Sequence, residues 1–388
     1  MKNKLIKKSI IRILAAILSI FVELYRKIRP IKPAIYFCYN QSVHQIYHSL
    51  FVAIELSNVQ DEYPVVVLST SRQASEIIEE ELSSIPNKVR FQKIRHPGYG
   101  KTDFDINLFV FLCRLRIHRP KAVVVTDYFD NVFRQLLIKT FWVYVPHGLA
   151  NREFAFEPHI KDYDLVILPG ERDLKAMQER IGPLSNCRVA GYSKLDYFHY
   201  HAVKALELFK EKRPVILYNP HFDEKLSSFF DKGMILLEQL SKSNKFNVIF
   251  MPHPDLSRKY PQIVRKTAEF KNVLLIERHR INLEYMAQAD IYITDVSSSV
   301  FEWLYFDKPA IFFNTKRVDW EKSKYYSSWA LGKVAEDVPQ LLIMLDDALK
   351  YPEEFREIRR EIFKNTFANR DKIVSKAIAE IIRDRIRG

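Results

Sequence analysis

Glycine is scarce in this chain, with nine among 388 residues, and the glycine-rich phosphate-binding motifs are missing. Neither G-x-G-x-x-G nor G-x-x-x-x-G-K-S/T occurs, which disfavours a dinucleotide-binding Rossmann fingerprint and a P-loop ATPase. Cysteine is rarer still: Cys38, Cys113 and Cys187 lie far apart in apolar runs, without a C-x-x-C pair. The sequence therefore predicts buried thiols in a reducing cytoplasm and no metal site.

Long hydrophobic runs are also absent. The uninterrupted apolar or small run at residues 13–22 is half as long as the about twenty residues of a membrane-spanning helix. Basic residues flank this run on both sides: Lys2, Lys4, Lys7, Lys8, Arg26, Lys27 and Arg29. No small-residue cleavage site of a signal peptide follows it. The pattern predicts an amphipathic helix at residues 1–30 that docks peripherally on the cytoplasmic face of a bacterial membrane, with a core-packing helix as the alternative.

Acidic residues are fewer than basic ones: 47 aspartates and glutamates face 60 lysines and arginines, for a net charge of +13. Such a surplus predicts anionic partners, among them nucleic acid, an anionic membrane surface and phosphorylated substrates. No zinc-finger spacing, RNP-like segment or arginine-rich tail occurs, so a nucleic acid partner is not expected. With 47% hydrophobic and 28% charged residues, the composition is that of a globular chain long enough for two domains.

Short apolar runs alternate with helical stretches along most of the chain after residue 30. A first series of strands is expected at residues 34–39, 64–68, 89–94, 122–126, 141–145, 165–168 and 188–190. A second series is expected at residues 215–218, 247–251, 273–276, 291–294 and 310–313, and helices include 43–56, 72–82 and 106–117. Strands that alternate with helices favour parallel sheets covered on both faces. The sequence thus predicts an α/β protein with two doubly wound, Rossmann-like domains.

The boundary between these domains is expected in the charged stretch KALELFKEKRP at residues 204–214, which ends in proline. We therefore expect one domain at residues 31–205 and the other at 206–365. A C-terminal helix is expected at residues 366–388, in a charged helical region that packs back across both domains.

Polar residues follow four of the expected strands, at the sheet edge where open α/β sheets bind their ligands. His147 and Gly148 follow one strand of the first domain. The strand ends of the second domain carry Asn219 and His221, then His253 with Arg258 behind it, and finally Asp295 with Ser297, Ser298 and Ser299. A histidine can exchange a proton near neutral pH, so each strand-end histidine is a candidate general base. His44 and His48, which have no third ligand, are interpreted as surface or core histidines.

The three serines raise a separate question, because one serine is enough to cap a helix. Three hydroxyls beside Asp295, at the start of an expected helix, suggest a bound anion such as a phosphate. A cap with two solvated neighbours is the alternative. Together with His253, which stands between two prolines, the serines predict a nucleoside diphosphate site in the second domain. The reacting histidine would then come from the first domain.

These residues resemble motifs of the CDP-glycerol glycerophosphotransferase family, the primases and polymerases of teichoic-acid and related capsule synthesis. The resemblance is carried by His147-Gly148, by His253-Pro254 and by the stretch TDVSSSVFEWLYFDKPAIFF. That stretch supplies Asp295, Ser297, Ser298, Glu302, Asp307, Lys308 and Pro309. The resemblance covers residues 142–313, with an overall match from residue 34 onward. It implies a GT-B-like fold, with two Rossmann-like domains facing one cleft, and peripheral attachment to the inner membrane face.

The resemblance also implies roles. His147 would deprotonate the acceptor hydroxyl, His253 would hold the donor phosphates, and Ser297 and Ser298 would hold the pyrophosphate. Arg152 stands five residues after the first histidine, where the family usually has a lysine. Two further departures concern donor and acceptor identity. Leu149 replaces a small hydroxyl residue, and YNPHF replaces the family's more usual APT stretch.

The predicted reaction is a phosphoryl transfer that needs no cofactor and no metal. An acceptor hydroxyl would attack the glycerol-bearing phosphorus of CDP-glycerol, and CMP would leave. Arg152 and Arg258 would neutralise charge, and Glu302 would contact a donor hydroxyl or lie solvated on its helix. The expected acceptor is a lipid-linked saccharide or a polyol-phosphate chain. Two alternatives stay open: a GT-B glycosyltransferase with a nucleotide-sugar donor, and a non-enzymatic basic protein that binds membranes or nucleic acid.

Overall fold

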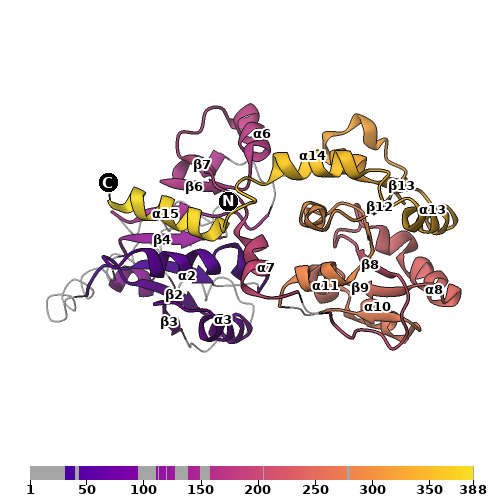
Figure 1. The fold of residues 1–388 in the computed structure, drawn as a ribbon, viewed down its shortest axis with the longest axis horizontal. Helices are drawn as coiled ribbons and strands as arrows, with labels where there is room; N and C mark the ends of the chain where they lie inside the picture. Colours follow the sequence, from indigo (N-terminus) through magenta and orange to yellow (C-terminus); the bar gives the residue numbers. More distant parts are fainter. Residues whose placement is uncertain are drawn as a thin grey trace, which may run out of the picture. The chain divides into compact units, whose positions relative to one another are not determined.

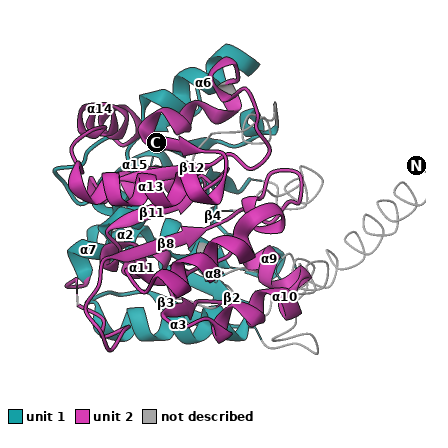
Figure 2. Cartoon of the chain, turned by 90° about the vertical axis from the view of Figure 1, so that its right-hand side faces the viewer, with its two compact units in different colours: residues 1–147, 156–200, 368–388 teal, residues 148–155, 201–367 magenta. Residues whose placement is uncertain are grey.

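The computed structural model describes residues 31–39, 43–94, 111, 113–118, 120–126, 139–148, 158–203, 205–277 and 280–387. The expected membrane helix at residues 1–30, Arg152, and half of the expected helix at 106–117 lie outside this range; the described residues 111 and 113–117 of the latter are helical. The chain forms two compact units (Figure 2). Unit 1 comprises residues 1–147, 156–200 and 368–388, and unit 2 comprises residues 148–155 and 201–367.

Unit 1 is built on a parallel sheet of seven strands in the order β3-β2-β1-β4-β5-β6-β7 (Figure 1). The strands are β1 (Ile35–Tyr39), β2 (Val65–Ser69), β3 (Arg90–Lys93), β4 (Ala122–Val125), β5 (Phe141–Tyr144), β6 (Leu165–Leu168) and β7 (Cys187–Val189). All seven lie where the sequence predicts strands, with ends shifted by one residue at most. β1, β2, β4 and β6 are buried along their whole length, which explains their continuous apolar runs.

The described helical segments of unit 1 include η1 (Val43–His48), α2 (Leu50–Val59), α3 (Arg72–Ser84), η3 (Pro158–Asp162), α6 (Glu171–Ile181), η4 (Ser193–Asp196), α7 (Tyr197–Tyr200) and α15 (Val374–Arg387). The single helix expected at residues 43–56 is in fact a 3₁₀ helix, η1, followed by α2. The break falls at Ser49, whose hydroxyl is 2.8 Å from the Tyr39 hydroxyl at the end of β1. This side-chain bond ties the break to the carboxyl edge of the sheet.

Unit 2 contains a parallel sheet of six strands in the order β10-β9-β8-β11-β12-β13. The strands are β8 (Val215–Asn219), β9 (Asn247–Phe250), β10 (Val273–Leu275), β11 (Ile291–Thr294), β12 (Ala310–Phe313) and β13 (Lys333–Ala335). The five expected strands are present. β13 was missed because it has three residues and begins with a lysine, so no apolar run marks it.

The helices of unit 2 are α8 (Met234–Ser243), α9 (Pro254–Lys259), α10 (Pro261–Lys266), α11 (Asn282–Gln288), α12 (Ser299–Trp303), α13 (Val338–Lys350) and α14 (Arg356–Thr366). A π-helical segment, η5 (Phe229–Gly233), and four 3₁₀ segments are also described: η6 (Thr267–Glu269), η7 (Leu304–Phe306), η8 (Trp320–Lys322) and η9 (Lys324–Leu331). Alternate strand residues such as Ile216, Val248 and Ile293 pack with α8 and α13 on one face of the sheet. On the other face Tyr292 stacks on Trp303 of α12, with ring centroids 5.3 Å apart.

The last helix belongs to unit 1, where α15 lies beside α2 (Figure 1). The Ala368 N–H donates to the Pro169 oxygen at 2.8 Å where the chain enters this unit. Gly191 has φ +112 there, and a Cβ would lie 2.7 Å from the Ala368 oxygen, so a side chain does not fit. The buried carboxylate of Asp196 accepts the N–H groups of Val374 and Ser375 at 3.1 and 2.6 Å. These contacts fix the start of α15.

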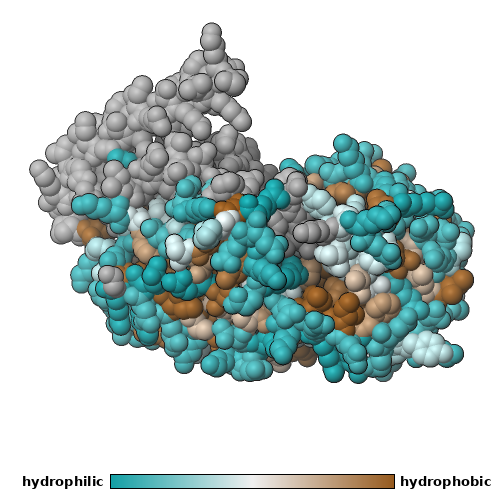
Figure 3. Space-filling view, turned by 90° about the horizontal axis from the view of Figure 1, so that it is seen from above, coloured by the Kyte–Doolittle hydropathy of each residue, from teal (hydrophilic) through white to brown (hydrophobic). Residues whose placement is uncertain are grey.

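Hydrophilic side chains predominate on the face shown in Figure 3, and hydrophobic ones form scattered groups. The largest exposed fractions among big hydrophobic residues are 66% at Ile343 and 60% at Val203. Within the described ranges, every helix is too short or too polar to cross a membrane.

Candidate functional site

Each sheet reverses its strand order once, between β1 and β4 in unit 1 and between β8 and β11 in unit 2. In open parallel sheets such a reversal opens a crevice beyond the carboxyl ends of the strands, where ligands bind. The candidate residues of the two units gather at these carboxyl ends, and each group is described within its own unit.

In unit 1, His147 lies just beyond β5 and is half-buried. Its Nδ1 is 2.5 Å from the main-chain oxygen of Thr126, the residue that follows β4. A carbonyl oxygen can only accept, so Nδ1 carries the proton and donates it. The neutral ring therefore presents an unprotonated Nε2, which is the form that a general base requires.

A second histidine lies beside His147. The ring of His48, the last residue of η1, is edge-on to His147 with centroids 6.4 Å apart, and edge-on to Tyr192 at 5.2 Å. The Ser193 hydroxyl donates to the His48 oxygen at 2.6 Å. His48 is buried, as the sequence interpretation allowed, but its place at the carboxyl edge was missed. In the sequence, only the short distance between His48 and the end of β1 indicated this position.

In unit 2, Asp295 follows β11 and is 1% exposed. Its Oδ1 accepts from the N–H groups of His221 and Val296 at 2.9 and 2.6 Å. Its Oδ2 accepts from the N–H and the hydroxyl of Ser228 at 2.7 and 2.9 Å. Burial raises the pKa of this carboxyl, and the hydrogen bonds from Ser228, His221 and Val296 oppose that shift. The carboxylate thus joins the ends of β8 and β11.

Asn219, at the end of β8, forms hydrogen bonds toward both neighbouring strands. Its amide nitrogen donates to the Met251 oxygen at 2.5 Å, and its amide oxygen accepts from the Tyr292 hydroxyl at 2.8 Å. Thr294 Oγ1 donates to the Asn219 main-chain oxygen at 2.8 Å. Asn219 therefore ties together the neighbouring strands β9, β8 and β11 near their carboxyl ends.

His221 and His253 lie close together at these strand ends, with ring centroids 6.0 Å apart. Phe222 contacts both rings, at 4.3 and 4.6 Å between centroids. His221 is 5% exposed, whereas His253 is half-buried. The structure thus brings together the two strand-end histidines that the sequence places in this domain.

The serine stretch lies where the sequence predicts it, but its hydrogen bonds differ from those of a simple cap. Ser298 occupies the N-cap position of α12, and its side chain makes no capping hydrogen bond. Instead Ser297 Oγ accepts from the Ser299 N–H at 3.2 Å. Ser298 is exposed, and Ser297 and Ser299 are half-buried.

Two further site candidates prove to have protein partners. Glu302 is 5% exposed, and its Oε2 accepts from Asn282 Nδ2 at 2.6 Å, so the alternative of a solvated helix residue is wrong. Arg258 has an exposed side chain that pairs with Asp255 at 2.9 Å, in the last turn of α9.

Sequence reasoning missed several residues that support this edge. Trp329 of η9 donates through Nε1 to the Asp295 main-chain oxygen at 2.8 Å. Asp307 and Lys308, which were expected only as motif positions, are structural. Asp307 pairs with the buried Arg359, while Lys308 Nζ donates to the oxygens of Ala287 and Ala289 at 3.2 and 2.5 Å, near the end of α11. Burial lowers the pKa of Lys308.

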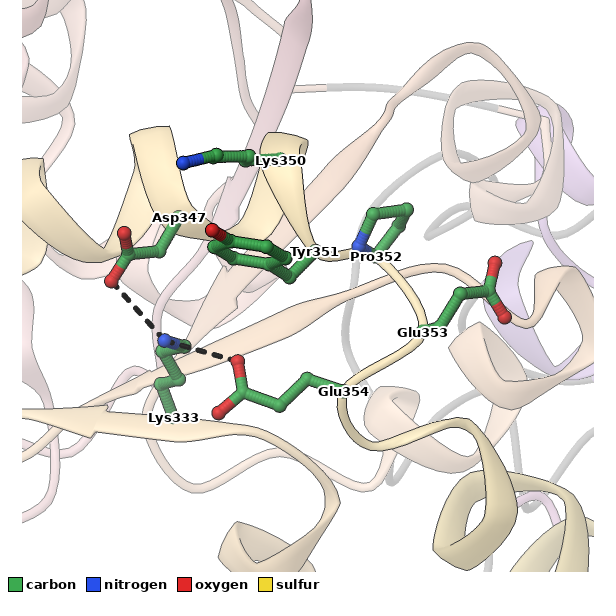
Figure 4. Close-up of a pocket in the computed structure, with 7 residues that line it drawn as sticks. All are labelled: Lys333, Asp347, Lys350, Tyr351, Pro352, Glu353 and Glu354. Atoms are coloured by element: carbon green, nitrogen blue, oxygen red, sulfur yellow. Dashed lines mark hydrogen bonds and ion pairs between the residues drawn. The ribbon is translucent and has the colours of Figure 1, made fainter.

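A pocket of about 640 Å³ lies elsewhere in unit 2 (Figure 4). It is lined by Lys333, Asp347, Lys350, Tyr351, Pro352, Glu353 and Glu354. The Lys333 ammonium is 3.2 Å from Asp347 and 3.0 Å from Glu354. Lys333 begins β13, so this pocket lies at the amino edge of the sheet, opposite the residues described above.

No group of three or more His, Cys, Asp or Glu side chains suited to a metal ion occurs among the described residues.

Residues 150–384 match the family model for CDP-Glycerol:Poly(glycerophosphate) glycerophosphotransferase. The chain belongs to this family. The chain is also 25% identical over 183 residues to the Minor teichoic acid biosynthesis protein GgaB of Bacillus subtilis (strain 168). That match covers 44% of this chain and 19% of GgaB, so the chain spans about a fifth of the length of this curated relative.

Solved structures show the same fold. The wall teichoic acid polymerase TagF has a TM-score of 0.68 at 13% identity, over 100% of this chain and 99% of the TagF chain. A histidine-to-asparagine TagF variant soaked with CDPG has a TM-score of 0.66 at 13% identity, and the match covers 100% of this chain and 98% of that chain. UDP-GlcNAc 2-epimerase from Neisseria meningitidis, bound to UDP-GlcNAc, has a TM-score of 0.62 at 16% identity, and the match covers 91% of this chain and 100% of that chain. These likenesses confirm the GT-B-like class of two Rossmann-like domains.

The family described by this model is one of glycerophosphotransferases, which are transferases. Membership favours the predicted group transfer over a non-enzymatic binding protein. The matched residues 150–384 include every strand end of unit 2, whereas His147 lies just before them.

Proposed function

We propose that the enzyme transfers a glycerol-phosphate unit from CDP-glycerol to a hydroxyl of a membrane-linked saccharide or polyol-phosphate acceptor, in the synthesis of a cell-surface polymer. The observation that carries the proposal is the family match over residues 150–384, because that range contains the whole strand-end group of unit 2. A nucleotide-sugar glycosyltransferase is the competing function, since an epimerase bound to UDP-GlcNAc shares the fold.

Unit 2 holds the donor in this proposal. Ser297, Ser298 and Ser299 supply hydroxyl and N–H groups beyond β11, and His253 supplies a ring beyond β9. The buried Asp295 keeps these loops in place through its four hydrogen bonds, so its role is to position rather than to touch a phosphate. Glu302 reaches the donor only if its bond to Asn282 is shared or exchanged.

His147 of unit 1 activates the acceptor. Its Nδ1–H is held by the Thr126 oxygen, and its Nε2 takes the proton of the acceptor hydroxyl. Gly148 follows it, and among the described residues no atom lies within 4 Å of a Cβ built there.

The transfer is a single displacement at phosphorus, in which one bond forms and one breaks. The acceptor oxygen forms a bond to the glycerol-bearing phosphorus, the bond from that phosphorus to the CMP oxygen breaks, and the acceptor proton moves to His147 Nε2. Such reactions depend mainly on positioning and on neutralising charge. Arg258 and Arg152 are the cations that we assign to the leaving CMP, Arg152 on its sequence position alone.

The proposed location is the cytoplasmic face of the bacterial membrane, with residues 1–30 as the peripheral anchor. The basic flanks of this segment and the net charge of +13 support binding to anionic lipid and to an anionic acceptor. Removal of residues 1–30 is expected to abolish sedimentation with vesicles that contain phosphatidylglycerol, and unchanged sedimentation would contradict the anchor.

A direct assay tests the reaction. The full chain is incubated with radiolabelled CDP-glycerol and a lipid-tailed disaccharide that carries one glycerol phosphate. Transfer of label to the lipid together with stoichiometric CMP release is the expected result. Transfer from UDP-sugars but not from CDP-glycerol would establish the glycosyltransferase instead, and a chain that uses neither donor would contradict both.

A further inference from the structure

The tetrapeptide P-H-x-D occurs twice at the carboxyl edge of the unit 2 sheet. Residues 220–223 read PHFD directly after β8, and residues 252–255 read PHPD shortly after β9. The two strands are hydrogen-bonded neighbours. The proposed function uses His253 of the second copy but assigns no role to His221 of the first. The repetition suggests that the two histidines act together.

Both copies fold into the same local turn. The Asp223 N–H donates to His221 Nδ1 at 3.0 Å, and the Asp255 N–H donates to His253 Nδ1 at 3.1 Å. A ring nitrogen that accepts a hydrogen bond carries no proton, so the proton of each neutral ring is on Nε2. Each turn therefore sets the same tautomer and directs an N–H away from its own backbone.

The two rings also belong to one cluster. Their centroids are 6.0 Å apart, and Phe222 packs against both at 4.3 and 4.6 Å. Lys259 Nζ lies 4.9 Å from the centre of the Phe222 ring and brings a positive charge to the cluster. The main-chain N–H of His221 donates to the Asp295 carboxylate, which precedes the serine stretch. The pair is thus tied to both sides of the point where the strand order reverses.

We propose that His221 and His253 form a matched pair of N–H donors for the diphosphate of the nucleotide donor. The inference rests on the proposed function for the identity of this ligand. A diphosphate carries anionic oxygens on two linked phosphates, so donors on two adjacent strands can each bind one. Hydrogen bonds to charged oxygens are stronger than those to neutral ones. Because both rings are set as neutral donors, the pair adds no charge of its own, and Lys259 adds its positive charge to those of Arg258 and Arg152.

The competing role for His221 is purely structural, since its Nδ1 closes a turn. Two substitutions separate the roles. His221→Asn keeps an acceptor close to the position of Nδ1 and removes the Nε2–H, whereas His221→Gln places an amide nitrogen close to the position of Nε2. The same pair at His253 gives a parallel series. His199→Asn, on α7 of unit 1, is the matched control for the loss of a histidine outside the site.

The experiment is calorimetric titration of the full chain with CDP and with cytidine, after thermal unfolding has shown that each variant is folded. His221→Asn and His253→Asn are each expected to weaken CDP binding about tenfold to a hundredfold, as for the loss of a hydrogen bond to a charged group. Cytidine affinity should be unchanged, because the nucleoside has no phosphate. Both glutamine variants should regain most of the CDP affinity.

The outcomes distinguish this inference from the proposed function. A wild-type chain that binds neither CDP nor UDP contradicts the proposed function. A wild-type chain that binds CDP, with unchanged affinity in His221→Asn, overturns the histidine pair alone. Equal losses of CDP and cytidine affinity in His221→Asn also overturn it, because they indicate a structural role. If UDP is the preferred ligand, the same series is run with UDP and uridine and decides the pair in the same way.

Discussion

His147 Nδ1 donates to the main-chain oxygen of Thr126 at 2.5 Å, so the ends of β4 and β5 together set the tautomer of this histidine. The carbonyl belongs to a residue that is 1% exposed and cannot turn away from the ring without disturbing the sheet edge. A histidine held in this way has its orientation and its proton position decided before any substrate arrives. This relationship leads to the first prediction.

His147→Ala is expected to lower kcat by about a hundredfold to ten-thousandfold, the usual contribution of a positioned general base. The dissociation constant for CDP-glycerol should change little, because the donor is assigned to unit 2. His147→Asn keeps an N–H that can reach Thr126 but has no basic nitrogen, and should be as impaired as the alanine variant. Single-turnover kinetics with saturating donor measure the effect, with His199→Ala as the control. Near-wild-type turnover in His147→Ala would remove the base from the mechanism.

Ser297→Ala/Ser298→Ala is expected to weaken CDP-glycerol binding about a hundredfold or more, because each hydroxyl would lose a hydrogen bond to a charged phosphate oxygen. Ser243→Ala removes a hydroxyl that donates to the Leu240 oxygen at the end of α8, and serves as the matched control. Calorimetry with CDP-glycerol, CMP and cytidine shows which part of the ligand loses affinity. An equal loss for cytidine, or no loss at all, would contradict a phosphate contact.

The regular part of this architecture was predictable because parallel strands buried on both faces leave continuous apolar runs, as in the VVVLS of β2. The same rule placed His147, His253 and Asp295 at carboxyl ends. It could not find His48, whose nearness to His147 depends on how η1 folds after β1. Likewise Trp329 shows no local signal, because its bond to the Asp295 oxygen joins residues far apart in sequence.

Asp295→Asn is expected to lower the free energy of unfolding by about 1–3 kcal/mol, because the amide nitrogen cannot accept from Ser228 and leaves a buried donor without its bond. Urea unfolding followed by tryptophan fluorescence measures this loss. Asp319→Asn, in an exposed ion pair with Lys322, is the control and should change little. Equal stability of Asp295→Asn and wild type would show that the four hydrogen bonds contribute nothing net.

The difference in unfolding free energy between wild type and Asp295→Asn should depend on pH in a defined direction. Burial raises the pKa of Asp295, so the folded chain binds this proton more tightly than the unfolded chain does. The stabilisation linked to this shift is fully present below the unfolded pKa and is lost as pH rises through the higher folded value. The advantage of wild type over Asp295→Asn should therefore shrink from acid toward neutral pH. An advantage that grows over this range would contradict the assigned direction.

Asp307→Asn removes the carboxylate that links the end of η7 to Arg356, Arg359 and Arg360 of α14. Asp307 has φ +51, a left-handed conformation that asparagine tolerates, so the substitution removes charge without straining the backbone. Arg359 is 1% exposed and would keep a buried guanidinium without its carboxylate. The expected loss of unfolding free energy is about 3–5 kcal/mol, against about 0–1 for Asp346→Asn in the exposed pair with Lys245.

Adding Arg359→Met to Asp307→Asn separates the charge from the shape of the site. If the cost comes from an uncompensated buried cation, removing that cation should restore part of the lost stability. Arg359 also donates to the main-chain oxygens of Asp307 and Pro352, at 3.3 and 2.8 Å. A double variant that is less stable than Asp307→Asn would therefore show that these two carbonyl bonds outweigh the ion pair. In that case Arg359 holds the Asp307 turn mainly through the backbone, and the carboxylate is secondary.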